Sequence, residues 1–457
     1  MSRIKTFMRT GLRRMRGEMG QALMRTFVAR AIAALGALAL ALVIGRLYGP
    51  DGMGVYALAY GFLLGVGTLA RMGMDNGLMR YVGQDPGSHR VPVYLRWALQ
   101  RTLMLSVVAG ALIWLLRYRL EGVFEAPGLA AVLVGIVLAA PPYAFGFLFS
   151  GFFKGIRKPA TACLLENGSV ALVAGALILA YGLWFGGNQL VVIGYAYAIA
   201  AWLVALQGGL QAWLWCRRQP WWGRGQMMDD IHVAVSRSQF MAVSRAFFVT
   251  GLANFMQSVL GLMIAGWLLT SAELGLFKSS QQTATLIGFI LIVINAIFPP
   301  RFAALYHRGE LSALGRLARQ GALLGLVIAA PLLVLCLVAP GWVLGWFGDE
   351  FRQGANLLRI IALAQLVNVA TGSVGFLLNM TGHERLMRNI ALLCNSLGLA
   401  GFFLLPQLFG ALGAALALAF VLVTQNLIAL FFVWRRLGIW TLPGPNLLHR
   451  LGVHGGR

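Results

Sequence analysis

The feature that most constrains this chain is a succession of apolar segments, each about long enough to cross a bilayer. A transmembrane helix needs about 20 mostly apolar residues to cover the hydrocarbon core. Twelve segments qualify, namely residues 26–47, 53–75, 98–117, 128–152, 160–182, 190–215, 243–269, 275–298, 320–347, 354–379, 386–408 and 410–434. Only 11% of the residues are charged, whereas a soluble protein usually has about a quarter. We therefore predict an all-α integral membrane protein with about twelve transmembrane helices, the eighth of which ends at Pro299 and Pro300.

The distribution of basic residues predicts how these helices are oriented. With the N-terminus placed inside, 31 of the 37 Lys and Arg residues lie on the inner side. The outer side holds only Arg46, Arg117, Arg119, Lys278, Arg352 and Arg359. Loops rich in Lys and Arg stay in the cytoplasm, so both termini are expected there, in a bacterial inner membrane. The net charge of +23 is spread over these loops, which excludes a compact nucleic-acid-binding domain.

A polar stretch divides the chain into two sets of six helices. We expect a basic amphipathic segment at 1–25, a first bundle at 26–216, a cytoplasmic linker at 217–240, a second bundle at 241–434 and a basic tail at 435–457. Residues 1–20 place apolar side chains on one helical face and arginines around the rest, as in helices that lie on anionic membranes. A disordered basic tail remains an alternative.

Short motifs recur between the two halves at an offset of about 220 residues. Gly54-Val-Tyr-Ala corresponds to Gly275-Leu-Phe-Lys, and Gly146-Phe-Leu-Phe to Gly375-Phe-Leu-Leu. Two further pairs, RTFV (25–28) with RAFF (245–248) and IGYA (193–196) with LGAA (412–415), keep the same order. Since each half has an even number of spans, the repeat is parallel, with a substrate site expected between the halves.

Several of these segments resemble one transporter family. The first-half segments are GRLYGPDGMGVYALA (45–59) and MGMDNGLMRYV (72–82); the second-half segments are AELGLF (272–277), INAIFPP (294–300), LLNMTGHE (377–384) and GALGAALA (410–417). They are similar, in order, to the polysaccharide flippases among the multidrug/oligosaccharidyl-lipid/polysaccharide exporters. The resemblance covers roughly residues 20 to 440. It implies a MATE-like fold of two pseudo-symmetric six-helix bundles in a V, with a central cavity.

Polar side chains inside the predicted spans are candidates for binding substrate, because a charge at mid-membrane costs roughly 2.5–3.5 kcal/mol and needs a reason. The candidates are Arg30, Arg71, Asp75, Arg80, Arg245, Asn254, Gln257, Lys278, Gln282 and Asn368. The cations would attract a diphosphate, and guanidinium groups suit phosphate because their donors form a bidentate fork. The amides would hydrogen-bond successive sugars.

Structural roles explain the same residues equally well. Arg30, Arg80 and Arg245 lie near the inner interface, where long basic side chains commonly reach back to water. Arg71 and Asp75 are four residues apart and could form a structural ion pair. The amide stripes could serve helix packing, which uses the same residue types.

These observations favour a translocator over an enzyme. The sequence has no nucleophile–base pairing, no metal-ligand spacing and no Gly-x-x-x-x-Gly-Lys motif, so we expect no catalytic residue, metal or cofactor. The expected cargo is an undecaprenyl-diphosphate-linked oligosaccharide, with a polysaccharide polymerase and export machinery as partners. An ion-coupled drug or metabolite antiporter of the same fold remains open, although the acids inside the spans, Asp75 and Glu166, lie near inner ends. A membrane-embedded polymerase or an assembly scaffold is a further alternative.

Overall fold

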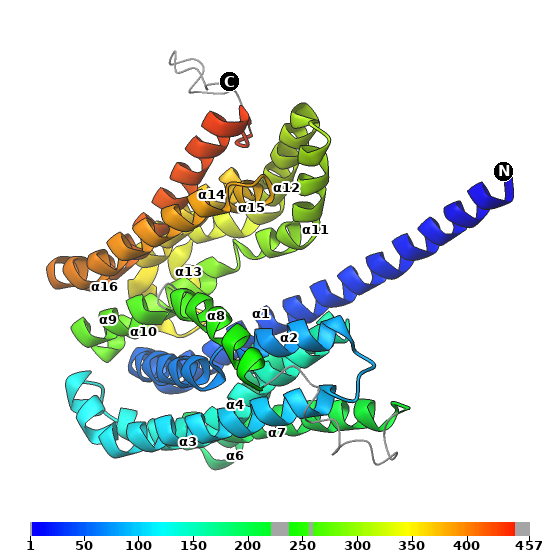
Figure 1. Ribbon diagram of the computed structural model, residues 1–457. Coiled ribbons are helices and arrows are strands. Elements are labelled where there is room, and N and C mark those ends of the chain that lie inside the picture. Colours follow the sequence, from blue (N-terminus) through cyan, green and yellow to red (C-terminus); the bar gives the residue numbers. More distant parts are fainter. Residues whose placement is uncertain (1, 221–236, 256–258, 444–457) are drawn as a thin grey trace. The chain divides into compact units, whose positions relative to one another are not determined.

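The computed structural model describes residues 2–220, 237–255 and 259–443, and within these ranges the chain forms helices and turns without a strand (Figure 1). The side chains before Met24 lie outside the described residues, as do residues 221–236 of the linker and residues 444–457 of the tail. The expected amphipathic surface of residues 1–25 therefore stays a prediction. The all-α fold class is confirmed.

Helical segments cover each of the expected spans within the described residues. In the first half they are α1 (Ser2–Arg71), α2 (Met74–Gln84), α3 (Val91–Val123), α4 (Leu129–Gly155), α5 (Pro159–Cys163), the π-helix η1 (Leu164–Gly168), α6 (Ser169–Phe185) and α7 (Val191–Arg217). In the second half they are α8 (Arg237–Phe255), α9 (Gly261–Leu268), α10 (Ser271–Thr285), α11 (Phe289–His307), α12 (Leu311–Val338), α13 (Pro340–Leu344), the 3₁₀-helix η4 (Asp349–Gly354), α14 (Ala355–Thr371), α15 (Val374–Met380) and α16 (Glu384–Leu437).

Seven helical stretches of the described residues are long and apolar enough to cross a membrane, or eight if the bent pair Pro159–Glu166 and Ser169–Phe185 is one span. One of the seven, Asp349–Met380, joins η4, α14 and α15. Two of these helices each contain two expected spans. α1 breaks at Gly49, which has φ 67°, and α16 breaks at Gly410, which has φ 57°. Other spans are built from two shorter helices, such as α10 with α11. Breaks of this kind occur in membrane proteins where neighbouring elements satisfy the freed backbone groups.

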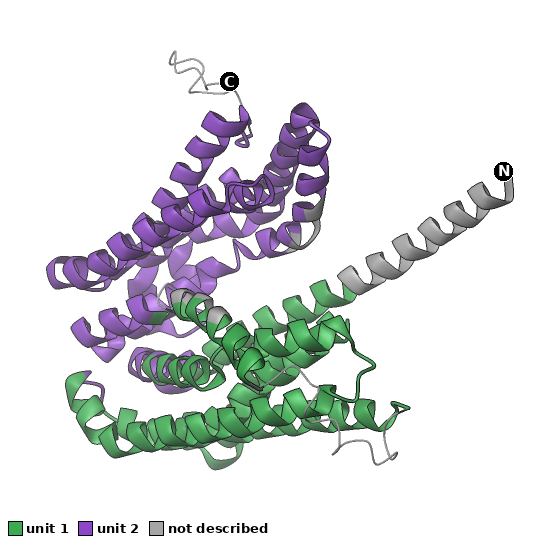
Figure 2. Cartoon of the chain, in the orientation of Figure 1, with its two compact units in different colours: residues 1–44, 58–123, 127–259 green, residues 45–57, 124–126, 260–457 purple. Residues whose placement is uncertain are grey.

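The chain forms two compact units (Figure 2). Unit 1 comprises residues 1–44, 58–123 and 127–259, and unit 2 comprises residues 45–57, 124–126 and 260–457. The segment 45–57, around the break in α1, thus belongs with the second half of the chain. Conversely, α8 follows the linker but packs on α2 of unit 1. The units therefore exchange segments instead of dividing at residues 217–240 alone.

Close backbone packing around α4 organises unit 1, where α4 contacts α2, α3 and α7. A Cβ placed on Gly151 would lie 2.8 Å from the carbonyl carbon of Asp75, and one on Gly194 would lie 3.1 Å from that of Val132. Small residues at such crossings let membrane helices approach closely where no hydrophobic driving force exists between them. The consequence is that α4 holds α2, and with it Asp75, at a fixed distance.

In unit 2 the repeat produces a reciprocal helix crossing. A Cβ on Gly54 would lie 2.7 Å from the carbonyl carbon of Ser271, and a Cβ on Gly275 would lie 2.8 Å from that of Pro50. Gly54 corresponds to Gly275, and Pro50 to Ser271, at the same offset of 221 residues. Each segment therefore presents its glycine to the other's backbone, as two copies do across a two-fold axis. This crossing is direct evidence of the pseudo-symmetry predicted from the motifs.

Two local expectations are wrong. The helix predicted to end at Pro299 and Pro300 continues as α11 to His307. The span expected to run unbroken from 53 to 75 ends at Arg71, because Met72 (φ 45°) and Gly73 (φ 72°) turn the chain before α2 begins. A Cβ on Gly73 would lie 2.5 Å from the backbone N of Phe248 in α8, so this turn is where α8 packs on the chain.

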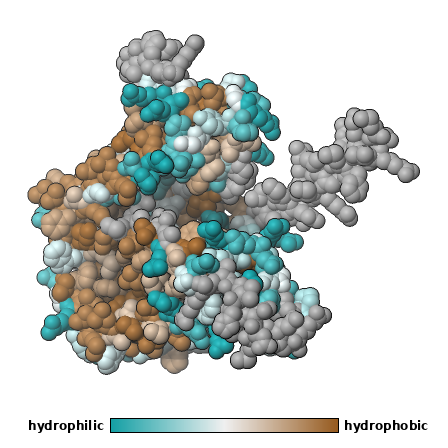
Figure 3. Space-filling view, viewed as in Figure 1, coloured by the Kyte–Doolittle hydropathy of each residue, from teal (hydrophilic) through white to brown (hydrophobic). Residues whose placement is uncertain are grey.

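The surface agrees with a membrane environment, since large apolar side chains are widely exposed on both units. Leu183, Val338 and Leu408 are among those with more than 70% of their surface accessible. Figure 3 shows that apolar residues cover much of the visible face of each unit. A soluble protein rarely exposes contiguous apolar surface of this extent.

Candidate functional site

Arg71 and Asp75 form an ion pair in unit 1 across the turn between α1 and α2. The Arg71 Nη1 lies 3.4 Å from Asp75 Oδ2, and its Nε donates to the Gly67 carbonyl at 2.8 Å. The guanidinium also stacks over the Phe147 ring of α4, 3.8 Å from its centroid. Only 12% of the Arg71 side chain and 21% of the Asp75 side chain are exposed. The guanidinium is thus held in place by three groups.

Glu166 is the centre of a second ionic cluster in unit 1, on the π-helix η1. Its carboxylate accepts a hydrogen bond from Ser150 Oγ at 2.8 Å and pairs with Lys154, both on α4. Arg30, an exposed residue of α1, lies near Cys163, the residue before η1. Single-turn π-helices occur often at functional sites. Both acids that the sequence places inside the spans, Asp75 and Glu166, are therefore paired with cations.

Arg80 and Arg245, the other described candidates of unit 1, are not brought together. Arg80 on α2 and Arg245 on α8 are exposed, and the described residues provide no ion pair for either. This exposure fits side chains that reach toward water at an interface. The Asn254 side chain and residue Gln257 lie outside the described residues, so their suggested roles stay predictions.

In unit 2, Asn368 belongs to a continuous network of uncharged polar groups. Its Nδ2 donates to Gln365 Oε1 at 3.0 Å, and Asn426 Nδ2 donates to Asn368 Oδ1 at 3.2 Å. Thr371 Oγ1 lies 3.3 Å from Asn426 Oδ1, and Thr441 Oγ1 donates to the Thr371 carbonyl at 2.8 Å. The network joins α14 to α16 and to the segment that follows α16, so it has a structural role whatever else it binds.

Lys278 and Gln282 lie one helical turn apart on α10, and both are partly buried. No carboxylate of the described residues forms an ion pair with Lys278. Lysine is almost never buried unless paired, and an ammonium inside the membrane marks a candidate functional site. Lys278 thus differs from Arg71 in that no carboxylate among the described residues neutralises its charge.

The clusters provide charge and hydrogen bonds but no recognisable catalytic geometry. Among the described residues, no group of three or more His, Cys, Asp or Glu side chains could hold a metal ion. Their chemical capacity is to bind anions through Lys278 and the arginines, and hydroxyl-bearing groups through the amides.

Solved structures of several membrane transporters share this all-helical fold. The chain is similar to the lipid II flippase MurJ in an inward closed conformation, with a TM-score of 0.70 at 10% identity over 89% of this chain and 86% of that one. It is also similar to an inward-facing multidrug resistance MATE family transporter, with a TM-score of 0.66 at 14% identity over 90% of this chain and 98% of that one. A third similar structure is a transporter of the same superfamily from Pyrococcus furiosus, with a TM-score of 0.56 at 13% identity over 91% of this chain and 95% of that one.

The sequence itself identifies the family. Residues 23–305 match the family model described as polysaccharide biosynthesis protein, and the chain belongs to this family. No curated protein sequence matches it. The membership confirms the family predicted from the motifs, and the solved structures confirm the MATE-like fold.

Sequence reasoning missed several partners of the candidate residues. Phe147, Lys154 and Thr441 were not expected to contact polar groups of other helices. Lys154 and Glu166 are twelve residues apart across the short turn between α4 and α5. The sequence did offer a signal for this ion pair. Lys154 lies near the end of α4, and Glu166 lies soon after the turn that follows, so two opposite charges face each other across that turn.

Proposed function

We propose that this protein is a flippase that translocates undecaprenyl-diphosphate-linked oligosaccharide repeat units from the cytoplasmic to the periplasmic leaflet. It would act by alternating access in O-antigen, capsule or exopolysaccharide biosynthesis. The observation that carries the proposal is its membership of the polysaccharide biosynthesis family. A multi-pass transporter from a polysaccharide pathway implies a cargo that is built on one side of the membrane and used on the other.

The charges in the described residues support an anionic cargo. Among the described residues Lys278 has no carboxylate partner, whereas Asp75 and Glu166 are both neutralised by neighbours. A cation-exporting antiporter needs the opposite arrangement, with an acid free to exchange its cation. The diphosphate would bind at Lys278 and nearby donors, and the amides of the Asn368 network would hydrogen-bond sugars. The apolar outer surface would leave the polyprenyl chain in the bilayer.

The topology completes the proposal. The count of basic residues favours cytoplasmic termini in a bacterial inner membrane. A polysaccharide polymerase and export machinery would receive the cargo on the periplasmic side. The protein itself would form and break no covalent bond.

Proteoliposomes loaded with a fluorescent undecaprenyl-diphosphate oligosaccharide test the proposal. Wild-type protein should move the lipid from the outer to the inner leaflet, where an added glycosidase cannot reach it. The rate of this protection should be proportional to protein density. Lys278→Gln should lower that rate about 10- to 150-fold, because a charge-assisted hydrogen bond contributes about 1.5–3 kcal/mol. The control is Arg119→Gln, which removes an exposed cation at the end of α3. A wild-type protein that leaves the lipid where it was, yet exchanges small organic cations for protons in an Asp75-dependent manner, would establish the antiporter instead.

A further inference from the structure

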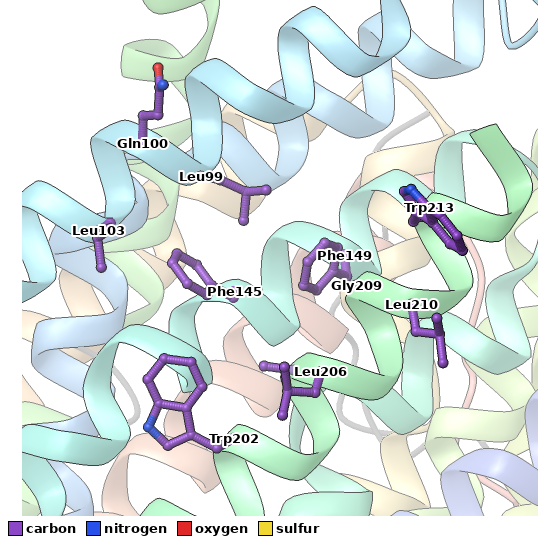
Figure 4. A pocket seen from close by; sticks show the side chains of 11 residues that line it. Leu99, Gln100, Leu103, Phe145, Phe149, Trp202, Leu206, Gly209, Leu210 and Trp213 are labelled. Carbon is purple, nitrogen blue, oxygen red and sulfur yellow. The ribbon is translucent and has the colours of Figure 1, made fainter. Parts of the chain in front are cut away.

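A groove on unit 1, between α3, α4 and α7, has the dimensions of a lipid site. Two adjoining cavities of about 520 and 350 Å³ form it. Figure 4 shows Phe145 and Phe149 of α4 between the leucines of α3 and those of α7. The residues common to both cavities are Leu99, Gln100, Phe149, Gly209 and Trp213, so the two are one continuous groove.

The groove is as long as one leaflet is deep. Its lining extends along α7 from Trp202 to Cys216, a distance of about 21 Å at 1.5 Å per residue. A bilayer with its interfacial regions is about 40–45 Å thick, so one leaflet is about 20–22 Å deep. A polyprenyl chain of 55 carbons greatly exceeds this length, whereas one acyl chain matches it.

The charged residues lie at one end of the groove only. Arg96 lines the cavity that reaches Cys216, and Arg217 lies 4.6 Å from the ring centroid of Trp213, which lines both cavities. No carboxylate of the described part of the chain pairs with Arg96. The other end, at Leu103, Phe145 and Trp202, is apolar. The basic-residue count assigns the arginine end to the cytoplasmic face.

We infer that this groove binds an anionic phospholipid of the cytoplasmic leaflet. Arg96 and Arg217 would hold its phosphate, and an acyl chain would lie along Phe149 and Gly209. Basic pockets between transmembrane helices on the cytoplasmic side recognise anionic head groups in this way. The inference concerns a lipid that stays bound to unit 1, and it does not depend on which cargo the protein moves.

Gly209 gives the groove its depth. A Cβ there would lie 3.3 Å from the Phe149 ring, so any larger side chain must occupy the space above that ring. Leu206 also lines the groove, whereas Leu203, on the same helix, does not. A large side chain at position 206 would therefore fill the groove, whereas one at position 203 would change the surface of α7 outside it.

The test is native mass spectrometry of the full-length protein purified in detergent and titrated with phosphatidylglycerol or phosphatidylcholine. Wild type should bind one phosphatidylglycerol more tightly than any phosphatidylcholine. Arg96→Gln should weaken that site about fivefold, the factor for roughly 1 kcal/mol per basic residue. Arg119→Gln, the matched arginine at the other end of α3, should leave it unchanged.

Filling variants locate the acyl chain. Gly209→Leu should abolish the tight site. Leu206→Trp should also abolish it, and this variant serves as the test if Gly209→Leu does not fold. Leu203→Trp should have no effect. Equal losses in Arg96→Gln and Arg119→Gln would overturn the inference in favour of non-specific surface charge. Displacement of phosphatidylglycerol by equimolar undecaprenyl phosphate would overturn it in favour of a polyprenyl occupant.

Discussion

The reciprocal crossing at Gly54 and Gly275 predicts that a single methyl group at either glycine destabilises unit 2. A Cβ at Gly54 would lie 2.7 Å from the carbonyl carbon of Ser271 and 3.0 Å from its Cα. Carbon atoms in contact are about 3.5–4.0 Å apart, and the Ser271 carbonyl oxygen is nearer still, so the two backbones must separate by at least about 1 Å. A side chain could relieve such a clash by rotating, but two backbone segments cannot.

The expected magnitude follows from two opposing terms. Overpacking of this kind costs about 1–3 kcal/mol, and the value here should lie near the upper end because both segments are buried around Met53 and Leu274. Replacing Gly by Ala in a helix contributes about 1 kcal/mol of stability. The net destabilisation for Gly54→Ala should therefore be about 1–2 kcal/mol. For a unit of about 200 residues this lowers the melting temperature by roughly 2–8 °C.

The measurement is thermal unfolding of purified protein in one fixed detergent, followed by intrinsic tryptophan fluorescence. Gly275→Ala should have a similar effect, since a Cβ there meets Pro50 in the same way. The double variant should cost less than the sum of the two, because one displacement relieves both contacts. Gly341→Ala in α13 is the control, since nothing lies within 4 Å of a Cβ there. A Gly54→Ala protein that melts with the control, or a strictly additive double variant, would refute the reasoning.

Three further outcomes are expected. Asn426→Ala should cost about 1–3 kcal/mol by leaving Asn368 Oδ1 without its donor, and a double-mutant cycle of the two asparagines should give a coupling above about 0.5 kcal/mol; zero coupling would contradict the network. Lys154→Met should destabilise more than Lys154→Met with Glu166→Gln, because the single change leaves a carboxylate without its cation; thermal melts in parallel measure the difference. Lys278→Arg should retain most of the transport that Lys278→Gln loses, since it keeps the charge; loss of transport in both would mean that the ammonium is not acting as a simple cation.

The residues that sequence reasoning placed well are those whose behaviour depends on their near neighbours along the chain. Each apolar span is recognisable on its own because a transmembrane helix makes its backbone hydrogen bonds within the segment and needs no other part of the chain for them. The glycines at 54 and 275 were visible as a repeat, and the structure gives them a shared physical role. The ion pair of Arg71 and Asp75 was anticipated from their separation of four residues, although a turn and not a continuous helix brings them together.

Contacts between distant segments were beyond the sequence. Thr371 meets Asn426, 55 residues away, and Thr441, 70 residues away. The stacking of Arg71 on Phe147 and the packing of α8 on Gly73 are of the same kind. A polar residue in a span looks alike whether it binds a ligand or another helix, because both uses need the same side chains.

The amino-acid sequence by itself determined that this is a helical membrane protein of the polysaccharide biosynthesis family, built from two related halves. Hydropathy, basic-residue distribution and repeated motifs are properties of short segments, and they persist in any arrangement of the helices. Only the tertiary structure decided which charges are neutralised, where the spans break and which segments the two units exchange. It paired Glu166 with Lys154, left Lys278 without a carboxylate among the described residues, and formed the groove above Phe149. Pairing and packing depend on distances between helices, and no single segment carries that information.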